Sequence, residues 1–99
     1  MKKEYALITG ASSGIGLEIS KVLAQKGFSL VLVSRREDKL KEVSQDLIQN
    51  YKTPVTYFVS DLEDPAAPKA IFEFCINKGY FISLLVNNAG YALPDAFHK

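Results

Sequence analysis

Short apolar runs alternate along the chain with longer stretches in which apolar residues recur at helical spacing. The apolar runs are residues 5–9, 28–33, 55–59 and 82–86. Such short and nearly continuous runs are typical of strands buried on both faces of a parallel sheet. The stretches between them predict helices over residues 14–26, 37–51 and 64–78. The alternation predicts a doubly wound α/β fold with helices on both faces of the sheet, as a single domain over residues 1–99.

Each predicted helix carries an apolar stripe. The stripes are Ile15, Ile19, Val22 and Leu23 in the first helix, Leu40, Val43 and Leu47 in the second, and Ile71, Phe72, Cys75 and Ile76 in the third. Asp64-Pro65 has the form of an N-cap and a first-turn proline, so the third helix is expected to begin there. Glu63 and Asp64 would then lie where a helix favours anionic groups.

The predicted strand order has a consequence for the last strand. Right-handed crossovers and the usual nucleotide-fold order give 3-2-1-4, which leaves residues 82–86 at an edge of the sheet. The composition Leu84-Leu85-Val86 suits the middle of a sheet instead. We therefore expect the chain to be part of a larger domain, or to self-associate through this edge. The alternative is a complete small domain ending at Lys99.

A glycine-rich turn lies between the first strand and the first helix. Gly10, Gly14 and Gly16 permit a sharp turn, a close approach to a bulky anion, and tight packing of the helix on the strand. The helix start offers free N–H groups, including that of Ile15, to a dinucleotide pyrophosphate. Hydroxyl donors are available from Ser12 and Ser13. A turn that collects glycine for backbone reasons alone is the alternative, and the strand–turn–helix context disfavours it.

The tip of the second strand predicts which dinucleotide binds. It ends at Ser34-Arg35-Arg36, about 20 residues after the last glycine, where a dinucleotide site reads its ribose. A carboxylate there would bind a ribose 2′-hydroxyl, whereas a guanidinium can bind a 2′-phosphate in bidentate fashion. Arg35 therefore favours NADP(H) over NAD(H). A solvated, positively charged helix entrance is the alternative, and it fits Arg36 better than Arg35.

Together these motifs resemble the short-chain dehydrogenase/reductase family over essentially the whole chain. Thr9 to Gly16 is similar to the family's T-G-x-x-x-G-I-G loop, and Asn87-Asn88-Ala89-Gly90 to its N-N-A-G turn. The resemblance implies that Asn88, Ala89 and Gly90 line the ribose and nicotinamide side of the cofactor. It implies that Asp61 and Leu62 border the adenine. Ser34-Arg35 is similar to the pattern of NADP-dependent members.

The catalytic signature of that family is missing from this chain. Its members use a serine and a Y-x-x-x-K helix that follow the N-N-A-G turn. The tyrosines here are Tyr5, Tyr51, Tyr57, Tyr80 and Tyr91, and none has a lysine four residues later. No catalytic residue is predicted. The expected function is the cofactor-binding half of an oxidoreductase that interconverts a carbonyl and an alcohol by hydride transfer. The alternative is a non-catalytic NADP(H)-binding module, and a flavodoxin-like or signalling domain is disfavoured.

Composition excludes several other classes. Twelve basic and eleven acidic residues give a net charge of +1, so no surface for nucleic acid or membranes is expected. No apolar run approaches the roughly 18 residues of a membrane span, and the start does not resemble a signal peptide, so a cytoplasmic protein is expected. The lone Cys75 is expected in the core. The single His98 has no partner cluster, so no metal site is predicted.

Overall fold

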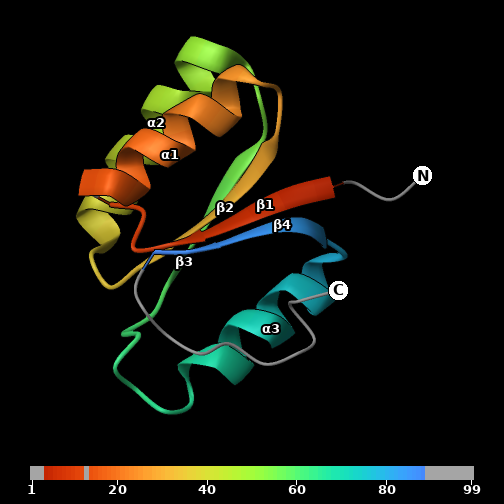
Figure 1. Ribbon diagram of the computed structural model, residues 1–99. Coiled ribbons are helices and arrows are strands. Elements are labelled where there is room, and N and C mark those ends of the chain that lie inside the picture. The colour runs from red at the N-terminus through yellow and green to blue at the C-terminus, as the bar shows by residue number, and fades with distance from the viewer. Residues whose placement is uncertain (1–3, 13, 89–99) are drawn as a thin grey trace.

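The computed structural model describes residues 4–12 and 14–88, which form four strands and three helices (Figure 1). In chain order these are β1 (Glu4–Thr9), α1 (Gly14–Gln25), β2 (Ser29–Ser34), α2 (Glu37–Tyr51), β3 (Val55–Val59), α3 (Ala67–Lys78) and β4 (Phe81–Asn87). The predicted alternation of strands and helices is confirmed, and the bounds of every element except α3 agree closely with those predicted.

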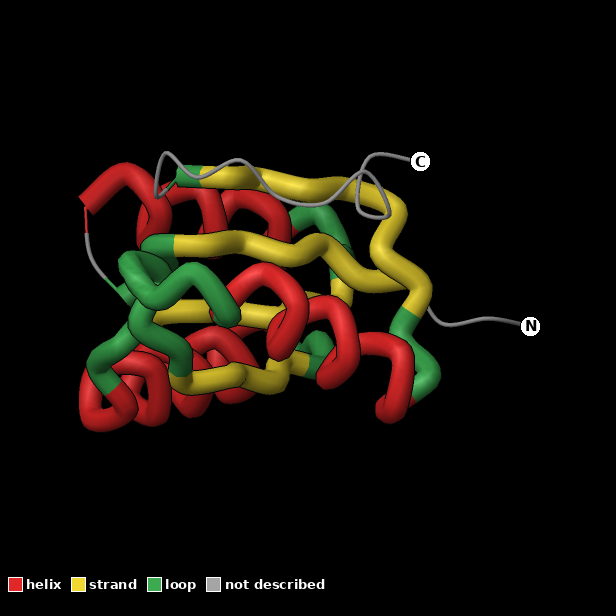
Figure 2. Tube along the Cα trace, turned by 90° about the horizontal axis from the view of Figure 1, so that it is seen from below, coloured by secondary structure: helices red, strands yellow, loops and turns green. Residues whose placement is uncertain are grey.

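The sheet is parallel and has the order β3-β2-β1-β4, as predicted. Leu7 in β1 lies opposite Val31 in β2 and Leu85 in β4. Helices α1 and α2 cover one face and α3 covers the other, which gives three layers (Figures 1 and 2). Because all strands run the same way, their carboxyl ends meet at one edge of the sheet.

Alternate residues of the strands fill two separate cores. On the α3 side, Leu7 and Val31 pack with Ile71 and Cys75. On the side of α1 and α2 the core consists mainly of Ala6, Ile8, Leu30, Leu32, Leu40 and Leu47. The two sets alternate along β1 and β2 because successive strand side chains point to opposite faces. A sheet buried on both faces explains why these strands are almost continuously apolar.

The apolar stripe predicted for α2 is confirmed, but the stripe predicted for α1 is wrong in part. Leu23 is buried, whereas Ile15 is 70% and Val22 is 50% exposed. The buried face of α1 is instead made mainly of small residues, Gly16, Ser20 and Ala24 with Leu23. The Ser20 hydroxyl donates to the Gly16 carbonyl at 2.7 Å. Small residues let the helix approach the sheet closely at its first turn, and Ile15 and Val22 lie on the outward side of the helix.

The start predicted for α3 is also wrong, because the helix begins at Ala67 rather than at Asp64. A carboxylate oxygen of Asp64 accepts from the Ala66 N–H at 2.9 Å, and the Asp64 carbonyl accepts from the Ala67 N–H at 2.9 Å. Asp64 therefore closes a turn ahead of the helix. The proline in the first helical turn is Pro68, because a proline there costs no intrahelical hydrogen bond.

Cys75 lies in the α3-side core, where it is 1% exposed. Burial raises the pKa of its thiol to about 11. The neutral thiol therefore predominates at neutral pH, which suits a packing residue and not a nucleophile. The predicted core position of Cys75 is confirmed.

Strand β4 lies at an edge of the sheet, with Phe81 and Leu84 exposed. Within residues 4–12 and 14–88, no helix has both the length and the apolar character that crossing a bilayer requires.

Candidate functional site

A pocket of about 230 Å³ opens at the carboxyl edge of the sheet. Its lining residues follow β1, β2 and β3: Gly10, Ser34, Arg35, Ser60, Asp61, Leu62 and Glu63. Open parallel sheets bind ligands in the crevice outside the carboxyl ends of their strands. Five of the seven lining residues were candidates from the sequence, and Ser60 and Glu63 were not.

The glycine turn forms one wall of this edge. Gly10 has φ 65° and Gly14 has φ 60°, in the left-handed region where a Cβ is unfavourable. The Ala11 N–H donates to the Val33 carbonyl at 3.2 Å and so fixes the turn against β2. Helix α1 begins at Gly14, so its unpaired N–H groups, including that of Ile15, lie in the first turn beside the loop.

Gly16 is required for a packing reason. A Cβ built on Gly16 would lie 2.1 Å from the Gly10 carbonyl oxygen and 2.9 Å from the Asn88 side-chain nitrogen. There is no room for a side-chain heavy atom at residue 16, so the first turn of α1 packs directly on the loop backbone. This close approach places the start of α1 directly beside the glycine turn.

The turn after β4 is joined to the glycine turn by two side chains. Asn88 Nδ2 donates to the Gly10 carbonyl at 3.3 Å. The Thr9 hydroxyl donates to Asn87 Oδ1 at 3.0 Å. The sequence suggested a backbone role for Asn88 and gave no sign of this side-chain contact, because it spans 78 residues of chain. Ser13, Ala89 and Gly90 are predicted site residues that lie outside the described residues.

Replacing Asn88 with Ala is expected to lower the free energy of unfolding by about 1 kcal/mol, the usual net contribution of one hydrogen bond. It should also weaken dinucleotide binding, because the Gly10 carbonyl loses the amide that holds it. Urea denaturation and a dinucleotide titration measure the two effects. Asn50→Ala, at the exposed end of α2, is the matched control. Equal stability of the two variants would contradict the holding role of Asn88.

Ser34 connects the glycine turn to the segments that follow β2 and β3. Its hydroxyl lies 2.9 Å from the Ser12 hydroxyl and accepts from the Arg36 N–H at 3.3 Å. Its carbonyl accepts from the Ser60 N–H at 2.9 Å. Three loops that are distant in sequence are therefore held together at the mouth of the pocket. The sequence placed Ser12 and Ser34 in the site but did not foresee that they contact each other.

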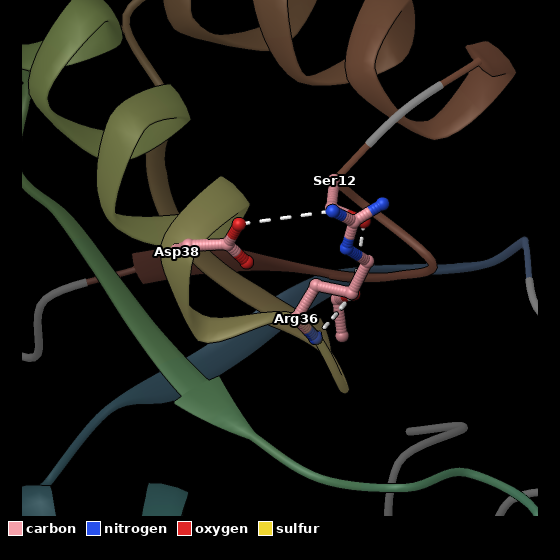
Figure 3. A network of polar contacts seen from close by, with 4 residues as sticks. Ser12, Arg36 and Asp38 are labelled. Atoms are coloured by element: carbon pink, nitrogen blue, oxygen red, sulfur yellow. Dashed lines mark hydrogen bonds and ion pairs between the residues drawn. The ribbon is translucent and has the colours of Figure 1, made fainter.

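The two arginines occupy different places. Arg35 lines the pocket. Arg36 stands at the start of α2, where its Nη2 lies 3.7 Å from an Asp38 carboxylate oxygen (Figure 3). Of the two arginines, only Arg35 is therefore part of the pocket lining. The roles of both arginines remain predictions.

The turn after β3 forms the opposite wall. Asp61 Oδ1 accepts from the Glu63 N–H at 3.0 Å, and Leu62 is buried against the α3-side core. Glu63 Oε2 lies 3.7 Å from Arg35 Nη1. Glu63 therefore faces the pocket instead of starting α3, which corrects the sequence interpretation. The signal that could have located it is its place directly after Asp61-Leu62, at the same sheet edge as Arg35.

Residues 4–12 and 14–88 contain no group of three His, Cys, Asp or Glu side chains that could hold a metal ion. His98 lies outside the described residues.

These features fit a nicotinamide dinucleotide. A helix start approached through Gly16 offers N–H groups to phosphates, and the pocket between β2 and β3 carries a guanidinium where an adenosine ribose would be read. Fold and site define the class of nucleotide-binding α/β proteins. A model of the short chain dehydrogenase family matches residues 4–99, and the chain belongs to this family.

Similarity to individual proteins agrees with this family assignment. The chain is 40% identical over 100 residues to a very-long-chain 3-oxoacyl-CoA reductase of Eremothecium gossypii, an alignment that covers 97% of this chain and 28% of that protein. The crystal structure of L-sorbose reductase from Gluconobacter frateurii, complexed with NADPH and L-sorbose, superposes with a TM-score of 0.82 at 37% identity. It covers 91% of this chain and 34% of that one. A short-chain dehydrogenase from Sphingobium yanoikuyae in complex with NADPH gives a TM-score of 0.79 at 37% identity, with 90% and 34% covered.

The chain thus spans about a third of the length of the proteins it matches, between 28% and 34% in these three comparisons. Family membership makes it part of an oxidoreductase family.

Proposed function

We propose that residues 1–99 form a single NADP(H)-binding unit of a short-chain oxidoreductase that interconverts a carbonyl and an alcohol. The observation that carries this proposal is the placement of Arg35, without an acid at the tip of β2, in the pocket beside the glycine turn. The family match and the NADPH-bound structures of related proteins support it.

The proposed contacts follow the order of the strands along the carboxyl edge. The first turn of α1, with Gly14, Ile15 and Gly16, holds the pyrophosphate, and Ser12 and Ser13 add hydroxyl donors. Arg35 binds the 2′-phosphate. Asp61 and Leu62 border the adenine, while Asn88, Ala89 and Gly90 lie along the ribose and nicotinamide.

The bound cofactor would supply a hydride to, or accept one from, the substrate carbon. The residues of this chain would bind the dinucleotide and orient it. None of them is proposed as the proton donor, because no tyrosine in residues 1–99 is followed by the lysine of the Y-x-x-x-K motif. A substrate-binding wall and the groups that move the proton would come from other parts of a longer protein.

The second candidate is a non-catalytic module that holds NADP(H) without turnover. The same absence of the Y-x-x-x-K motif favours it for the chain taken alone. Translating the reading frame beyond Lys99 separates the two candidates, because a serine followed by a Y-x-x-x-K helix is required only by the oxidoreductase.

The proposal is tested by titrating the protein with NADPH and with NADH and following the fluorescence of the reduced nicotinamide. Residues 1–99 contain no tryptophan, so this unit adds no indole emission to the signal. Saturable binding with a preference for NADPH is the expected result. Equal affinities would remove the assignment of NADP(H), and binding of neither dinucleotide would overturn the proposed function of this unit.

A further inference from the structure

The only charged partner of Arg35 within the described residues is Glu63. The guanidinium Nη1 and the carboxylate Oε2 are 3.7 Å apart, and the two side chains are 66% and 83% exposed. Arg35 follows β2 and Glu63 follows β3, and both line the same pocket. The guanidinium proposed to bind a 2′-phosphate thus faces a carboxylate of this chain.

The backbone holds Glu63 in that place. Its N–H donates to Asp61 Oδ1 at 3.0 Å, and the Asp64 N–H donates to the Asp61 carbonyl at 2.9 Å, which closes a tight turn. The Ser60 N–H donates to the Ser34 carbonyl at 2.9 Å, which ties this turn to the tip of β2. The backbone of Glu63 is therefore held near Arg35, whatever conformation its exposed side chain adopts.

We propose that Glu63 competes with the 2′-phosphate of NADP(H) for Arg35 and so limits the preference of this site for NADP(H) over NAD(H). This inference rests on the proposed function. A phosphate dianion and a carboxylate seek the same N–H donors of one guanidinium, and they repel each other when both are close to it. Binding of the 2′-phosphate then requires Arg35 to exchange partners.

The geometry makes that exchange feasible. The ion pair is long at 3.7 Å and open to solvent, and exposed pairs of this kind contribute little. Glu63 is therefore a competitor that a phosphate can displace, with an effect of a few fold and not orders of magnitude. NADH carries an uncharged 2′-hydroxyl in the same place, so its binding should be insensitive to the charge at residue 63.

The test uses the natural full-length protein that contains residues 1–99 and compares NADPH and NADH dissociation constants for the unmodified protein and Glu63→Gln. The substitution keeps the size of the side chain and removes its charge. The expected result is about two- to fivefold tighter binding of NADPH, in line with the small strength of an exposed pair, with NADH unchanged. Glu73→Gln, on an exposed position of α3, makes the same change of net charge away from the pocket and should alter neither constant.

The same substitution made in the Arg35→Ala variant separates competition for Arg35 from general repulsion between Glu63 and the 2′-phosphate. In Arg35→Ala the carboxylate has no guanidinium to occupy, so adding Glu63→Gln should give no further gain for NADPH. An equal gain with and without Arg35 would overturn the competition, as would unchanged or weaker NADPH binding in Glu63→Gln alone. If the unmodified protein prefers NADPH while Glu63→Gln has no effect, only this inference fails. If the unmodified protein binds neither dinucleotide, the proposed function fails and this inference with it.

Discussion

Gly16→Ala is expected to abolish measurable NADPH binding and to lower the free energy of unfolding by about 2–3 kcal/mol, the upper part of the range for overpacked interiors. The added methyl would lie 2.1 Å from the Gly10 carbonyl oxygen, which is backbone and cannot rotate away. Helix α1 must then move off the glycine turn. That movement withdraws its N–H groups from the phosphates and separates Asn88 from Gly10. Denaturant unfolding and the NADPH titration measure the two losses.

Gly27→Ala is the matched control for this variant. Gly27 has a positive φ, of 92°, but a Cβ there would meet no atom within 4 Å. Its substitution should cost only the conformational strain of about 1–2 kcal/mol and leave NADPH binding intact. If Gly16→Ala bound NADPH as well as Gly27→Ala does, the close approach of Gly16 to Gly10 would have no role in binding.

Replacing Arg35 with Ala is expected to weaken NADPH binding about ten- to a hundredfold while NADH binding is kept. A charge-assisted hydrogen bond contributes roughly 1.5–3 kcal/mol, and each 1.4 kcal/mol is a factor of about ten in a dissociation constant. NADH lacks the 2′-phosphate, so it loses nothing when the guanidinium is removed. Parallel titrations with both dinucleotides measure the difference.

Lys69→Ala removes a cation from an exposed position of α3 and should leave both dissociation constants unchanged. This control separates a contact with the 2′-phosphate from a general loss of positive charge. Equal weakening of NADPH and NADH in Arg35→Ala would show that Arg35 shapes the pocket without selecting the phosphate.

Much of the fold could be predicted from local pattern. The near-continuous apolar character of residues 5–9 and 28–33 predicted strands buried on both faces, and Leu40, Val43 and Leu47 predicted the buried side of α2. Handedness and the usual nucleotide-fold order then restricted the sheet to β3-β2-β1-β4. These features follow from periodicity and chain chirality, which act over a few residues or over whole elements and need no knowledge of particular contacts.

The predictions from the sequence were wrong where the position of one segment depends on its contacts with another. Apolar periodicity could not tell that Ile15 and Val22 turn outward, because the orientation of α1 is set by the contact of Gly16 with the Gly10 carbonyl. Likewise Asp64 has the chemistry of an N-cap, yet it closes a turn that delays α3 to Ala67. Both outcomes depend on competition between local propensity and packing.

The order of strands and helices, the glycine turn and the positive charge after β2 could all be predicted, because each depends on residues that are adjacent in the chain. Which groups meet at the carboxyl edge of the sheet depends on the folded arrangement of distant segments. It placed Arg35 and not Arg36 in the pocket, brought Glu63 to within 3.7 Å of Arg35, and bonded Asn88 to Gly10. Parallel strands bring the ends of distant segments together, and the partner that each side chain finds there depends on register and helix position, which no single segment encodes.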